Sequence, residues 1–129
     1  MGNKEPTLSK NVSIVHAGEL TQEKALEALR TAAQSATEAL PAALAKCAGD
    51  QDACTKVMTD RDTVVLAYQN SLQKTLVQTG ALFERTAENL ETEADNVKKK
   101  SATLSGVSDA INLFTELIRL ATSLALAFG

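Results

Sequence analysis

Residues 21–50, TQEKALEALRTAAQSATEALPAALAKCAGD, decide the fold of this chain. Apolar residues recur there at alternating spacings of three and four, which is typical of a helix face packed in the manner of a coiled coil. Thr21, followed by Glu23 and Glu27, predicts the helix start, because acidic residues are favoured in the first turns. Ala48-Gly49-Asp50 predicts its end. The apolar face consists of Leu26, Leu29, Ala33, Ala36, Leu40, Ala43 and Cys47.

Pro41 lies inside this helix. Because proline removes an internal hydrogen bond, we expect it to kink the helix or restart it. The apolar face nevertheless continues in register beyond Pro41, so both halves are expected to face the same core.

A second helical stretch begins at Asp52 or at Thr59 and runs towards Lys98-Lys99-Lys100, a cationic run typical of a helix C-terminus. Gly80 lies halfway along it. A single glycine costs only about 1 kcal/mol in a helix, and no proline or turn cluster stands beside it. We therefore expect one long helix bent at Gly80, with a break there as the alternative. The expected apolar positions are Val65, Leu72, Leu76, Thr79, Phe83, Thr86, Leu90 and Val97.

The last helix is expected from about Asp109 to Phe128, after a loop at residues 101–108, and it is the most apolar part of the chain. Ser105 or Ser108 is available to cap it. Glu116 and Arg119 stand three residues apart and are expected to pair on its outer surface.

These patterns predict an all-α fold. It is an elongated antiparallel bundle of three helices, or of four if the chain breaks at Gly80. Residues 20–129 form a single domain, and residues 1–19 form an extended polar arm. Composition agrees, because aromatic residues make up only 3% of the chain while helix-favouring alanine is abundant.

Cys47 and Cys54 are separated by six residues, a spacing too wide for the common zinc or redox pairs. They suit a disulfide across a helix–loop–helix corner, which would stabilise the fold by roughly 2–3 kcal/mol. A disulfide implies an extracytoplasmic location, in the periplasm, on a lipoprotein-like tether or in secreted form. The alternative is two buried cytosolic thiols.

Between Asp62 and Glu84 only Lys74 is charged. A helix face exposed to water normally carries many charges, so we expect residues 63–83 to lie beside the last helix in the middle of the bundle. A single central helix of about 60 Å would be only half covered by its neighbours, which predicts a homo-oligomer. The candidate interface residues are Val65, Tyr68, Leu72, Leu76, Phe83, Phe114, Leu117 and Leu124.

No catalytic or metal-binding motif is apparent, and we expect no cofactor and no enzymatic activity. His16 is the only histidine, too few for the common zinc sites. Glu84, Glu88, Glu91 and Asp95 share a helix face; we interpret it as solvated rather than as an acid–base or calcium site. The net charge of −3 argues against nucleic-acid binding.

The leading hypothesis is a non-enzymatic extracytoplasmic bundle that acts by protein–protein contact, as an accessory factor, adaptor or inhibitor. The second hypothesis is a bundle that docks on or acts on membranes through residues 109–128. A third, weaker hypothesis is a carrier of a lipid-like ligand, for which close alanine packing leaves little room.

Overall fold

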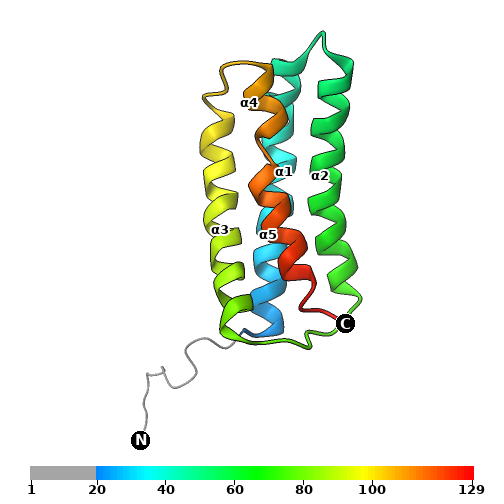
Figure 1. Ribbon diagram of the computed structural model, residues 1–129, viewed down its shortest axis with the longest axis vertical. Helices are drawn as coiled ribbons and strands as arrows, with labels where there is room; N and C mark the ends of the chain where they lie inside the picture. The colour runs from blue at the N-terminus through cyan, green and yellow to red at the C-terminus, as the bar shows by residue number, and fades with distance from the viewer. Residues whose placement is uncertain (1–19) are drawn as a thin grey trace, which may run out of the picture.

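The computed structural model describes residues 20–129, whose helices form an antiparallel bundle of four columns (Figure 1). Three columns are single helices, α1 (Gln22–Cys47), α2 (Gln51–Leu72) and α3 (Ala81–Ser101). The fourth column consists of two short helices, α4 (Val107–Asn112) and α5 (Thr115–Ala125). The all-α bundle is therefore confirmed. The arm expected at residues 1–19 lies outside the described residues.

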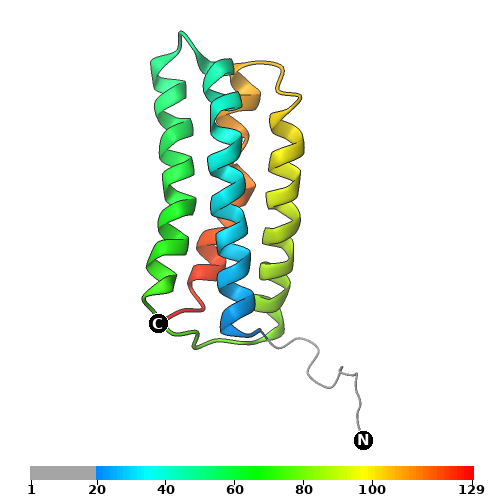
Figure 2. The same ribbon diagram turned by 180° about the vertical axis from the view of Figure 1, so that it is seen from behind.

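α1 is the helix that contacts every other helix of the bundle. It packs against α2, α3, α4 and α5, and Figure 2 shows it between α2 and α3. Its start is the predicted one, because the Thr21 hydroxyl accepts a hydrogen bond from the Lys24 amide at 3.1 Å. The helix continues through Pro41 to Cys47, so the chain does not restart at the proline.

Most of the buried residues of α1 are alanines. Ala25, Ala28, Ala32 and Ala36 are fully buried, whereas Leu26 and Leu40 of the expected face are only half-buried. Small side chains let neighbouring helix backbones approach closely, so the tightest contacts fall on the alanine side of the helix.

The expected long helix is wrong, and the four-helix alternative is right. α2 ends at Leu72, residues 73–80 form an extended connector, and Gly80 is the N-cap of α3. The connector is held by the end of the chain. The Val77 amide donates to the Ala127 carbonyl at 2.8 Å, and the Gly129 amide donates to the Thr75 carbonyl at 2.9 Å. These backbone hydrogen bonds to residues distant in sequence replace the i to i−4 bonds that a continuous helix would make.

The connector also sets the topology. α2 and α3 follow one another in sequence but stand at opposite corners, each packed against α1 and α5 (Figure 1).

The oligomer was predicted from a single central helix of about 60 Å, and that premise is wrong. α2 has 22 residues and α3 has 21, each about 32 Å long. Because α2 and α3 are close to α1 in length, no helix extends far beyond its neighbours, and no half of a long helix is left uncovered.

The register of α2 differs by one residue from the expected one. Ala53, Val57, Val64 and Ser71 are buried, whereas Leu72 is half exposed. The expected face assumed that α2 continued into α3. Because the helix is separate, its orientation follows from its own start, which is linked to α1 at Asp50.

The last helix is interrupted, contrary to expectation. α4 ends at Asn112, α5 begins at Thr115, and Leu113 and Phe114 between them are buried in the core. The Leu113 amide bonds the Ala110 carbonyl, a three-residue spacing that tightens the turn. Both large side chains at the break, Leu113 and Phe114, therefore enter the core.

Candidate interaction surface

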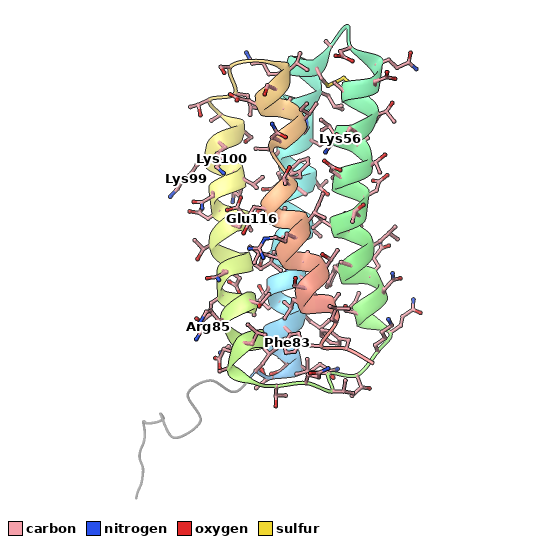
Figure 3. The ribbon with its side chains drawn as sticks, in the orientation of Figure 1. Lys56, Phe83, Arg85, Lys99, Lys100 and Glu116 are labelled. Atoms are coloured by element: carbon pink, nitrogen blue, oxygen red, sulfur yellow. A yellow bond between two sulfur atoms is a disulfide. The ribbon has the colours of Figure 1, made fainter. Side chains whose placement is uncertain are left out.

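The Cys47–Cys54 disulfide is present, with Cα atoms 5.4 Å apart. It closes the corner between α1 and α2, at the end of the bundle opposite the connector (Figure 3). Two local features shape this corner. Gly49 has a φ of 94°, a left-handed conformation that favours glycine, and Asp50 Oδ1 accepts a hydrogen bond from the Ala53 amide at 3.0 Å. A side-chain cap and a cross-link therefore hold the same turn.

The eight candidate interface residues fall into three groups. Phe114, Leu117 and Leu124 are fully buried, so they belong to the core rather than to an accessible surface. Leu72 is 50% exposed. The half-buried residues, at the edge of the core, are Val65, Tyr68, Leu76 and Phe83.

Three exposed aliphatic side chains at the connector end of the bundle are Leu72, Val77 and Leu82, at 50%, 61% and 68%; Leu126, at the end of α5, is 71% exposed. We call these three residues the end patch. They come from the end of α2, the connector and the start of α3, which Figure 1 places at one end of the molecule. Sequence reasoning included only Leu72. The low charge of residues 63–83 indicated the segment but not these side chains.

Charged residues border the end patch. Glu23 and Lys24 lie in the first turn of α1, and Arg85 lies in the first turns of α3, where it projects outward (Figure 3). Lys24 Nζ lies 2.6 Å from a carboxylate oxygen of Glu84. An apolar centre with a charged border is the usual anatomy of a protein–protein interface.

Two shallow grooves flank α2. One lies between α2 and α5 and has Leu66 and Leu126 among its lining residues, 52% and 71% exposed. The other lies between α1 and α2, where Val65 and Tyr68 face Arg30 and Ala33. The expected neighbourhood of residues 63–83 and the last helix is thus observed, because α2 packs on α5. The helix that contacts all the others is nevertheless α1.

The carboxylates of α3 behave differently from one another. Glu88, Glu91 and Asp95 are exposed, as expected, and Asp95 pairs with Lys99 at 2.9 Å. Glu84 is instead buried beside Lys24, which corrects its assignment to a solvated face. Glu93 is also buried, and sequence reasoning missed it because its position looked like one more exposed acid.

Several charged side chains of residues 20–129 form ion pairs on the surface. Glu116 and Arg119 pair on the surface of α5 as predicted, with Arg119 Nε donating to Glu116 Oε1 at 2.9 Å. The hydrogen bond from Arg119 lowers the pKa of Glu116, and the same bond raises the pKa of Arg119. Lys98, Lys99 and Lys100 occupy the last turn of α3, which confirms the expected helix end.

Within residues 20–129, no three His, Cys, Asp or Glu side chains gather closely enough to hold a metal ion. His16 lies outside this range. None of the helices in the same range combines the length and hydropathy needed to span a bilayer. Comparison with protein-family models, with curated proteins and with solved structures finds no match to this chain.

Proposed function

We propose that this protein is a non-enzymatic bundle that acts outside the cytosol by binding another protein through the end patch. The observation that carries the proposal is the exposure of Leu72, Val77 and Leu82, from three successive segments, at one end of the bundle. Exposed aliphatic side chains gathered in one region are typical of a contact surface. The partner would cover them and meet the charged border.

The border favours a protein over a lipid surface. Glu23 and Lys24 lie in the first turn of α1 and Arg85 in the first turns of α3, so the rim carries both signs of charge. A surface that binds anionic lipid is normally rimmed by cations alone. Mixed charge suits a protein partner, whose own charges can be arranged to match.

The disulfide supports a location outside the cytosol. Disulfides persist in oxidising compartments and are rare where glutathione keeps thiols reduced. Alkylation of protein from its native cells, followed by mass analysis, tests this part. Cys47 and Cys54 should resist alkylation until a reductant is added; free thiols in freshly trapped protein would contradict the location.

The contact itself is tested by site-specific photo-crosslinking in the native compartment. A photoreactive residue at Val77 or Leu82 should capture one and the same protein. Thr103, exposed at the opposite end of the bundle, is the matched control and should not capture it.

Binding must then be reproduced with the two purified proteins. Val77→Lys and Leu82→Lys should each weaken it at least tenfold, because a buried charge opposite an apolar surface is costly. Equal capture at Thr103, or unchanged binding by both variants, would overturn the proposed contact. Flotation of the wild type with liposomes, lost in these variants, would instead support membrane docking through the same end.

A further inference from the structure

The α2–α5 groove has a different composition from the end patch. The residues from the α2 side that line the groove follow one another at spacings of three and one, so they all lie on one face of the helix. Lys74 is the only charged residue in the lining. We call this surface the α2–α5 face, and its residues are Thr63, Leu66, Ala67, Asn70, Ser71, Lys74, Thr122, Ala125 and Leu126.

The α2–α5 face carries both parts of a self-complementary surface. Leu66 and Leu126 protrude into solvent, whereas Ala67, Ser71 and Ala125 are small and leave the hollow beside them. An interface between two copies related by a two-fold axis uses the same patch twice, so that patch must supply the protrusion as well as the hollow. A patch made only of protrusions or only of a hollow would need a different partner.

The directions of α2 and α5 also favour a two-fold symmetric pairing of two copies of the chain. α2 and α5 run parallel to each other, with both C-terminal ends beside the connector (Figure 1). A two-fold axis perpendicular to them sets each helix antiparallel to its copy, the orientation that helix dipoles favour. The two Lys74 residues then lie at opposite ends of the interface, so like charges do not meet.

We propose that the α2–α5 face binds the α2–α5 face of a second copy of this chain, forming a two-fold symmetric dimer. The face spans residues 63–74 of α2 and the turn beyond it, about 17 Å, and is two helices wide. That is smaller than the surface of a standard stable interface, so the dimer is weak and forms at high protein concentration. The end patch lies outside this face, so the dimer does not depend on the proposed partner contact.

Sedimentation equilibrium of the oxidised chain over a range of concentrations tests the dimer. The apparent mass should rise from that of one 13.6 kDa chain towards twice that value. Leu66→Lys should raise the dissociation constant at least tenfold, since it places a charge in the middle of the interface. Leu82→Lys is the control and should leave dissociation unchanged, because Leu82 belongs to the end patch and is 68% exposed against 52% for Leu66.

Symmetry is tested by cross-linking. Asn70 lies near the middle of the α2–α5 face, so Asn70→Cys should form a covalent dimer under mild oxidation, whereas Thr103→Cys should not. A wild-type chain that stays monomeric at millimolar concentration would overturn the dimer. So would equal effects of Leu66→Lys and Leu82→Lys, or equal cross-linking at positions 70 and 103. None of these results would affect the crosslinking outcome expected at Val77 and Leu82.

Discussion

Asp109 shows at the residue scale how one side chain shapes a turn. Its carboxylate accepts hydrogen bonds from the Ser105 amide at 2.9 Å and the Ser105 hydroxyl at 2.7 Å. These bonds, the backbone one first, lower the pKa of Asp109 below its ordinary value of 3.8. The serine and the acid together close the loop that precedes α4.

Replacing Asp109 should make stability less dependent on pH. A carboxylate with a lowered folded-state pKa stabilises the fold above pH 3.8, and this contribution is lost as the pH falls through the folded value. Asp109→Asn should therefore be less stable than wild type at neutral pH, and the difference should shrink in acid. Urea unfolding at about pH 7 and about pH 2.5 measures it. Glu91→Gln, at an exposed position of α3, is the control; a pH-independent difference for Asp109→Asn would contradict the assignment.

Alanine burial leads to a second prediction at this scale. Ala36 has no exposed surface, and it lies on the side of α1 that packs against other helices. Ala36→Leu should destabilise the bundle by about 1–3 kcal/mol, because close-packed interiors do not accept additional methylene groups. Thr37→Leu, at the neighbouring exposed position, should change the free energy of unfolding by less than about 0.5 kcal/mol. If the two variants were equally stable, the close approach of α1 to its neighbours would be wrong.

At the element scale, the α1–α2 hairpin is the best-defined unit. A helix cap, a left-handed glycine and a cross-link all act within Cys47–Cys54. Each is local in sequence, which explains why this corner could be predicted. α3 is attached differently, because its start depends on the connector and on the Lys24–Glu84 pair.

Reduction of the disulfide should lower the free energy of unfolding by about 2–3 kcal/mol without abolishing the fold, because the closed loop is short. Chemical unfolding of the oxidised and the reduced wild-type chain, followed by circular dichroism, measures this difference. Reduction is preferred to substitution because Cys47 is fully buried, and a smaller side chain would add a packing loss. Complete unfolding on reduction would show that the helices contribute less than their burial indicates.

At the scale of the whole molecule, the end of the chain completes the fold. Residues 127–129 pair with residues 75–78, and Phe128 is buried beneath them. The connector has a second anchor in α1, where Gln22 Oε1 accepts a hydrogen bond from the Leu76 amide at 3.0 Å. Three segments distant in sequence therefore meet at the end that carries the end patch.

Removal of the Phe128 ring should loosen this end before the rest of the bundle. Phe128→Ala should destabilise the fold by about 3 kcal/mol and speed amide hydrogen exchange at Val77 and Gly129, whose hydrogen bonds join the two segments. Exchange in the middle of α1 should change less. Leu126→Ala is the control, because Leu126 is 71% exposed. Unchanged protection at Val77 would mean that the connector holds its shape without the chain end.

For the candidate surface, the sequence indicated the segment that carries the exposed side chains but few of those side chains themselves. The low charge of residues 63–83 marked the connector and the face of α2 beside it. Leu117 and Leu124 were chosen for their hydrophobicity, yet they fill the core. Leu66 and Val77 were not chosen, because neither stands on an expected apolar face.

By itself, the sequence determined the features that act over a few residues: the helical class, the Thr21 cap, the disulfide corner and the cationic end of α3. Hydrogen bonds and dipoles between close neighbours produce these features, so a short pattern contains their cause. Tertiary structure alone decided the connector at 73–80, the register of α2 and the exposure of Leu66 and Val77. Each of these depends on packing between segments that are distant in sequence: residues 127–129 hold the connector, and α1 and α5 pack against α2.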